Sequence, residues 1–120
     1  MNSEVQDLYN GLGQLNTEYQ ATAGGVDTST TPKVQYGYSL MSGGANHSRQ
    51  TSMTYPDGRQ VNYGYFQSGS LNDRLSRLYN IADNGAATDL ESYFYMGLST
   101  VVKRAHAESD VDLTYIASSA

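Results

Sequence analysis

The sequence predicts an all-β fold of consecutive antiparallel hairpins, with about eight strands and no substantial helix. Three observations favour this fold. Apolar and polar residues alternate in several short runs, turn residues separate the runs, and the chain is rich in Tyr (11) and Gly (12). Alternation with a period of two is typical of a half-buried strand, and Tyr suits such strands because its ring can be buried while its hydroxyl stays hydrated.

The clearest hairpin spans residues 48–66. Its two runs flank Pro56-Asp57-Gly58, which fits a three-residue loop that begins as a type I turn and ends with Gly in the left-handed conformation. This loop pairs Met53 with Val61 and places both apolar sets on one face, whereas a one-residue slip exchanges the faces. We therefore expect a positive φ angle at Gly58.

The other elements follow in order along the chain. Further strands are predicted at residues 15–19, 34–38, 74–81, 90–95, 100–105 and 111–116. Loops rich in turn residues are predicted at 21–32, 42–47, 67–72, 83–85 and 106–110, while residues 1–10 carry weak signals. The strand at 74–81 is expected to hold Leu75, Tyr79 and Ile81 on one face.

Composition and charge exclude several classes of protein. Twelve acidic and seven basic residues give a net charge of −5, and without a basic patch nucleic-acid binding is not expected. The absence of cysteine excludes disulfides and cysteine-ligated metals. No apolar run approaches the ~20 residues that cross a bilayer, and Met1 does not open an export signal, so we expect no membrane insertion and place any export signal on a longer parent chain.

The chain also repeats itself. Val34-Gln35-Tyr36-Gly37-Tyr38 returns 27 residues later as Val61-Asn62-Tyr63-Gly64-Tyr65, and Ser48-Arg49 returns 28 residues later as Ser76-Arg77. Tyr63 and Tyr65 return as Tyr93 and Tyr95, and Leu113-Thr114-Tyr115 is a degenerate fourth copy. Such periods indicate an array of one supersecondary unit, in which each hairpin is stabilised by its neighbours. The first and last strands of a segment lack a neighbour, so we expect them to fray and to pair with other copies.

These residues resemble the RHS/YD repeat. Its unit is an Arg, an apolar residue four positions later, a Pro-Asp-Gly turn and Tyr-x-Tyr. The run Tyr9-Asn10-Gly11-Leu12-Gly13-Gln14-Leu15 is similar to the family's Tyr-Asp-x-x-Gly-Arg-Leu core, with Asn10 and Gln14 in place of Asp and Arg. Tyr95-Met96-Gly97-Leu98 resembles the same core, although Phe94 departs from it.

The resemblance covers residues 8–117 of a chain that we interpret as a single repeat segment, 1–120. It gives a first repeat with long loops at 8–47, a second at 48–72, a third at 73–98 and a partial fourth at 99–117. The residues that carry the motif are Tyr9, Gly13, Leu15, Tyr36, Tyr38, Arg49, Met53, Pro56, Asp57, Gly58, Tyr63, Tyr65, Arg77, Ile81, Tyr93, Tyr95, Gly97 and Tyr115.

The resemblance implies a segment of a spiral β-shell in a large bacterial protein that is extracellular or on the cell surface. In this family such a shell encloses a toxic effector domain or serves contact and adhesion. The implied partners are neighbouring repeats of a longer parent chain, together with an enclosed effector domain or a surface glycan. From the residues themselves, the tyrosine rows fit either a repeat core or an exposed ladder that stacks on sugar rings. A carbohydrate-binding or adhesion module is therefore the alternative function.

The histidines do not form a convincing catalytic site. His47 and His106 could join Ser48 or Ser109 in a triad, but no Gly-x-Ser-x-Gly turn is present and both fall in predicted loops. Asn46-His47-Ser48 matches a glycosylation sequon by pattern alone. We expect no catalytic residues, and we expect substitution of either histidine to leave the fold unaffected.

Metal and phosphate sites are not expected either. Asp110 and Asp112, with Glu108 nearby, fall short of the roughly six oxygens that Ca²⁺ needs. Asp83-Asn84-Gly85 lacks the acid spacing of a calcium loop, and Gly11-Leu12-Gly13 lacks the third glycine and the following helix of a phosphate loop. The sequence therefore predicts a protein without a cofactor.

Overall fold

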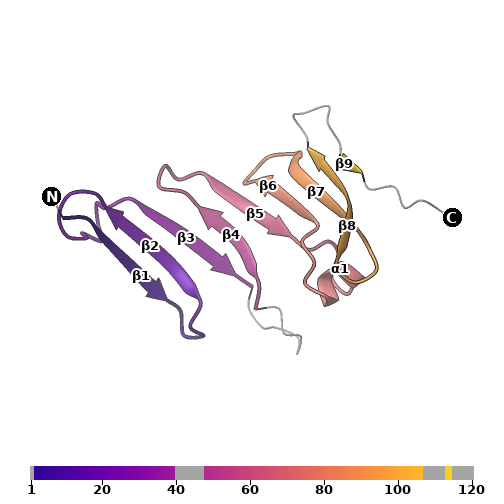
Figure 1. Cartoon of the computed structure of the whole chain (residues 1–120), viewed down its shortest axis with the longest axis horizontal. Coiled ribbons are helices and arrows are strands. Elements are labelled where there is room, and N and C mark those ends of the chain that lie inside the picture. Colours follow the sequence, from indigo (N-terminus) through magenta and orange to yellow (C-terminus); the bar gives the residue numbers. More distant parts are fainter. Residues whose placement is uncertain (1, 40–47, 107–112, 115–120) are drawn as a thin grey trace. The chain divides into compact units, whose positions relative to one another are not determined.

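A computed structural model describes residues 2–39, 48–106 and 113–114 of the chain (Figure 1). These residues form nine strands and one short helix, and the chain divides into two compact units, residues 1–60 and 61–120. Within each unit, strands that follow one another in sequence pair antiparallel. The prediction of an all-β fold built from antiparallel hairpins is therefore confirmed.

The first unit holds four strands in the order β1-β2-β3-β4. They are β1 (Glu4–Tyr9), β2 (Leu15–Ala21), β3 (Lys33–Tyr38) and β4 (Gln50–Thr54). Three alternate residues of β2, Thr17, Tyr19 and Ala21, are the buried residues of this unit among those that the structure describes. They share one face because side chains alternate along a strand, so the small core of this unit lies on one face of β2.

The predicted turn at Pro56-Asp57-Gly58 has the expected three-residue geometry. The Tyr55 N–H donates to the Arg59 carbonyl at 2.8 Å, and the Gly58 N–H donates to the Tyr55 carbonyl at 2.9 Å. The Asp57 carboxylate accepts from the Arg59 N–H at 2.9 Å, and Gly58 has φ +89°. This left-handed residue is the one for which the sequence pattern required glycine.

The second unit follows the same antiparallel plan. Its elements are β5 (Gln60–Gly64), whose first residue belongs to the first unit, α1 (Leu71–Arg74), β6 (Asn80–Asp83), β7 (Asp89–Met96), β8 (Thr100–His106) and β9 (Leu113–Thr114). Val61 is the buried apolar side chain among its described residues, and Asp73 is the buried charged one. No described helix is long and apolar enough to span a membrane.

The predicted strand at residues 74–81 is wrong over residues 74–79 and correct only at its last two residues. Its first residue, Arg74, closes the helix α1, and the strand β6 begins only at Asn80. Ser70 caps the helix, because its hydroxyl accepts from the Asp73 N–H at 3.2 Å while the Asp73 carboxylate accepts from the Gly69 N–H at 2.7 Å. Leu75 lies outside any strand and is 41% exposed, so it does not form a strand face with Tyr79 and Ile81.

Three smaller differences concern the ends of the chain. Strand β1 was not predicted, and it lies within the segment whose sequence signals are weak. His106 is the last residue of β8 and not the first of a loop. Of the strand predicted at 111–116, Leu113 and Thr114 form β9 and the rest lies outside the described residues, as do the predicted loop at 42–47 and Tyr115.

Candidate functional site

The most regular feature of the structure is a bulge that recurs at three tyrosines. Tyr9 in β1, Tyr38 in β3 and Tyr95 in β7 each lie where the register to the following strand shifts. In each case the following strand holds one extra residue, and these residues are Asn16, Thr51 and Val102. A bulge changes the direction of nearby side chains, and the three strand pairs share this irregularity at a tyrosine.

Two of these tyrosines bond to the backbone of the chain segment that precedes their strand. The Tyr38 hydroxyl donates to the Leu15 carbonyl at 2.8 Å, and the Tyr95 hydroxyl donates to the Leu78 carbonyl at 2.5 Å. Burial raises the pKa of the Tyr95 hydroxyl, while the nearby Arg77 guanidinium acts in the opposite direction. Both hydroxyls therefore join a tyrosine to the preceding segment through a main-chain acceptor.

The residues before the two acceptor leucines also correspond. Gly13 and Ser76 both have positive φ angles, +76° and +51°, and each is followed by a long polar side chain. The Gln14 amide donates to the Ser48 hydroxyl at 2.7 Å. The Arg77 guanidinium donates to the Gly97 carbonyl at 2.5 Å and lies 4.7 Å from the centroid of the Tyr95 ring.

This correspondence was missed in the sequence. The sequence repeat pairs Ser76-Arg77 with Ser48-Arg49, whereas in the structure Ser76-Arg77-Leu78 corresponds to Gly13-Gln14-Leu15. In both segments a residue with a positive φ angle is followed, two residues later, by a leucine carbonyl that accepts from a tyrosine hydroxyl. The correspondence is not obvious from the sequence because Ser76 stands where Gly13 stands in the first segment, and glycine is the residue that normally indicates a left-handed position. The spacing of a small residue, a long polar residue and Leu was the signal that could have revealed it.

The glycines of the two Tyr-Gly-Tyr runs occupy equivalent places. Gly37 lies opposite Ser52 of β4, and Gly64 lies opposite Asn80 of β6. A Cβ atom at either glycine would overlap the polar end of the facing side chain, Ser52 Oγ or Asn80 Oδ1. The repeated glycine is therefore explained by a close side-chain approach and not by a turn.

The tyrosine rows are neither fully buried nor fully exposed. Among the predicted motif residues, Tyr36, Tyr38, Tyr63, Tyr65, Tyr93 and Tyr95 are half-buried, as are Leu15, Arg49, Met53, Arg77 and Ile81, whereas Tyr9, Gly13, Pro56, Asp57, Gly58 and Gly97 are exposed. Burial and the Glu18 carboxylate raise the pKa of Tyr36. Tyr19, which sequence reasoning did not include in the motif, is the most buried described tyrosine at 6% exposure.

A polar cluster joins β7 to β8. The Arg104 guanidinium contacts the Glu91 carboxylate at 2.6 Å, and His106 Nδ1 lies 3.8 Å from the same carboxylate. Burial acts to raise the pKa of Glu91, but hydrogen bonds from Arg104 and Tyr93 outweigh it and hold the pKa below its usual range. His106 thus lies across the strand pair from Glu91, and this neighbour depends on register and has no local sequence signal.

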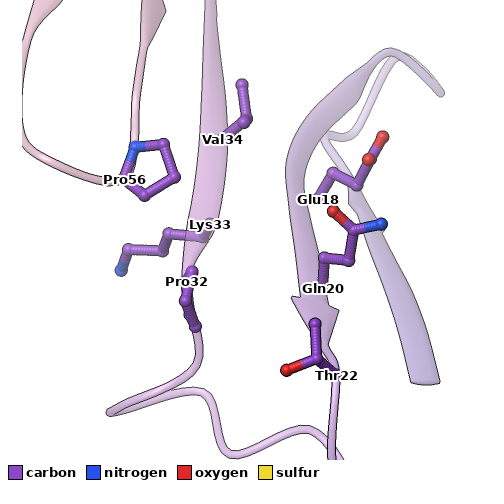
Figure 2. Close-up of a pocket in the computed structure, with 7 residues that line it drawn as sticks. All are labelled: Glu18, Gln20, Thr22, Pro32, Lys33, Val34 and Pro56. Atoms are coloured by element: carbon purple, nitrogen blue, oxygen red, sulfur yellow. The ribbon is translucent and has the colours of Figure 1, made fainter. Parts of the chain in front are cut away.

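A cavity of about 190 Å³ lies beside β2 and β3 in the first unit (Figure 2). Glu18 and Gln20 of β2 line it together with Thr22, which follows that strand. On the other side it is lined by residues 32–34, at the start of β3, and by Pro56 of the turn. None of its lining residues is aromatic, so it offers no surface for stacking a sugar ring. Ligand pockets usually enclose about 300–1,000 Å³, so this cavity is small for a cofactor.

The remaining sequence candidates that the structure describes lie in turns and local hydrogen bonds. The Ser48 hydroxyl accepts from Gln14, and Asp83 begins a turn closed by the Ala86 N–H at 3.0 Å. The part of the chain that the structure describes holds no group of three or more His, Cys, Asp or Glu side chains that could bind a metal. His47, Asn46, Glu108, Ser109, Asp110 and Asp112 lie outside the described residues.

No protein-family model matches the chain, and no curated protein sequence matches it.

Proposed function

We propose that the chain is a non-catalytic structural module, a segment of an RHS/YD-repeat β-shell in a large secreted or cell-surface protein of the toxin-enclosing or adhesive type. The observation that carries the proposal is the recurring bulge at Tyr9, Tyr38 and Tyr95. The first two tyrosines are 29 residues apart and the third follows after about twice that spacing. One supersecondary unit repeated along the chain accounts for both the spacing and the shared geometry.

The distribution of burial supports the same proposal. Only five described residues are buried, Thr17, Tyr19, Ala21, Val61 and Asp73, whereas most strand residues are half-buried. A sheet with so small a core gains stability from neighbouring repeats because each unit buries its apolar face against the next. Neighbouring repeats of a longer parent chain are therefore the proposed partners.

Sedimentation velocity across a concentration series tests this proposal. We expect association to increase with concentration, because strands at the ends of a repeat segment pair with other copies. A strict monomer at all concentrations that unfolds as one cooperative unit would contradict a repeat segment. Turnover of an ester, peptide or glycoside substrate that His106→Ala abolishes would contradict the absence of catalysis.

A carbohydrate-binding or adhesion module is the second candidate, and one cluster favours it. Phe66 and Tyr79 lie with ring centroids 4.7 Å apart, and Tyr79 and Phe94 with centroids 6.2 Å apart. Phe66 is 53% exposed and is held at φ +67°, a conformation that strains a side chain of this size. Quenching of tyrosine fluorescence by an oligosaccharide panel, lost in Tyr79→Leu, would support this candidate, and an unchanged spectrum would oppose it.

A further inference from the structure

The two hydrogen bonds from a tyrosine hydroxyl to a backbone carbonyl show how a strand with this bulge contacts the preceding segment. Tyr38 holds the Leu15 carbonyl and Tyr95 holds the Leu78 carbonyl. At Tyr95 the residue before the leucine adds two contacts, because Arg77 stacks on the tyrosine ring and donates to the Gly97 carbonyl two residues after the tyrosine. At Tyr95 the strand thus binds an Arg-Leu pair on the neighbouring segment through a ring face, a hydroxyl and a carbonyl.

Tyr9 has the same position in its hairpin, but its hydroxyl has no such carbonyl partner among the described residues. Its side chain is 61% exposed, and its hydroxyl makes no hydrogen bond to a described residue. Among the described strands, β1 pairs with β2 alone. Gly11 follows Tyr9 at the same two-residue spacing by which Gly97 follows Tyr95, but Gly97 has φ +66° and Gly11 does not have a positive φ angle, so the match to the Tyr95 site rests on the tyrosine itself.

We propose that the outer edge of β1 docks an extended segment with an Arg-Leu pair, supplied by a neighbouring repeat. The Tyr9 hydroxyl donates to the carbonyl of the docked leucine. The docked arginine stacks on the Tyr9 ring. This inference rests on the proposed repeat function, and it specifies that the edge of β1 prefers a segment with an Arg-Leu sequence.

The charge of the first unit favours arginine over the glutamine found at position 14. Asp7 of β1 lies directly opposite Glu18 of β2, so two carboxylates share one face of the sheet. Neither carboxylate has an ion-pair partner among the described residues. An arginine brought to this edge is attracted by that negative field, whereas a glutamine gains only its hydrogen bonds.

The probe is a synthetic peptide with the sequence of residues 75–83, Leu-Ser-Arg-Leu-Tyr-Asn-Ile-Ala-Asp. It is titrated into the whole ¹⁵N-labelled chain while amide chemical shifts are followed. We expect saturable shifts at the amides of β1, and weaker binding of a peptide that carries the Arg77→Gln change. We also expect the affinity difference between the two peptides to shrink as salt is added, because salt screens the carboxylate field.

Two chain variants decide whether Tyr9 is the docking residue. Tyr9→Phe removes only the hydroxyl and should lower the affinity for the peptide by about threefold to tenfold, which corresponds to the loss of one hydrogen bond. Tyr55→Phe, at another exposed tyrosine, should change the affinity less than twofold. Equal affinity for Tyr9→Phe and the unmodified chain, shifts outside β1, or no binding would overturn this inference. The proposed function has a separate readout, since loss of peptide binding leaves concentration-dependent association of the chain unaffected.

Discussion

Replacement of Gly64 by alanine tests why a glycine recurs inside the strands. In β5, Gly64 lies opposite Asn80, and an added Cβ would overlap Asn80 Oδ1. The Asn80 amide would have to move, and it donates to the Asp89 carboxylate at 2.7 Å. The loss of a hydrogen bond to a charged group costs about 1.5–3 kcal/mol, while the lower chain entropy of alanine in the unfolded state returns about 0.4–1 kcal/mol.

We therefore expect Gly64→Ala to lower the free energy of unfolding by about 1–2 kcal/mol. Urea denaturation measures this change, with Gly11→Ala as the control because nothing lies within 4 Å of a Cβ at Gly11 and its φ is not positive. That control should be neutral or slightly stabilising. In a double-mutant cycle, Asn80→Ala should relieve the overlap, so the double variant should lose less stability than the sum of the single variants. Additive losses would refute the steric explanation.

Three further predictions follow from particular contacts. Gly58→Val should lower the unfolding free energy by about 1–2 kcal/mol because a β-branched residue is strained at φ +89°, and unchanged thermal stability would contradict the turn geometry. Tyr38→Phe and Tyr95→Phe should each cost about 0.5–1.5 kcal/mol in urea unfolding through loss of the carbonyl bond; an effect at one site only would show that the two hairpins are not equivalent. The folded pKa of Glu91 is lowered, so the stability from its pairing with Arg104 should be present above the unfolded pKa of about 4.3 and be lost as the pH falls through the folded pKa. Glu91→Gln should therefore reduce the loss of unfolding free energy at acid pH. Parallel curves of stability against pH for the variant and the unmodified chain would contradict this.

The hairpins were predictable because their signals are local. Alternation and the Pro56-Asp57-Gly58 turn specify short-range pairing, and the structure has the expected positive φ at Gly58. The Tyr-Gly-Tyr repeat was also visible, but its physical cause was not, since the side chain facing each glycine depends on strand register.

The errors have identifiable physical reasons. Ser70 and Asp73 form a cap signal, a Ser followed three residues later by an acid, and this local signal outweighs the alternation that suggested a strand from residue 74. Strand β1 was missed because its acids, Glu4 and Asp7, weaken the apolar pattern of a largely exposed strand. The cluster around Glu91 joins two strands through register and has no local sequence signal.

The polar surroundings of the cavity were equally hidden. Glu18 and Val34 lie opposite each other only because of the β2–β3 register, and Pro56 reaches the same place from a turn more than twenty residues later in the chain. Contacts of this kind follow from how strands are placed beside one another, which no single run of residues specifies.

Native-state hydrogen exchange across a concentration series is the most direct test that the chain is a segment of a repeat array. Strands with neighbours on both sides, such as β2, β3 and β7, should be protected more than β1, whose edge is open within the described residues. Protection of β1 should rise with concentration as other copies or a docked segment cover that edge. Uniform and concentration-independent protection from β1 to β8 would show a closed domain and contradict the repeat-segment account.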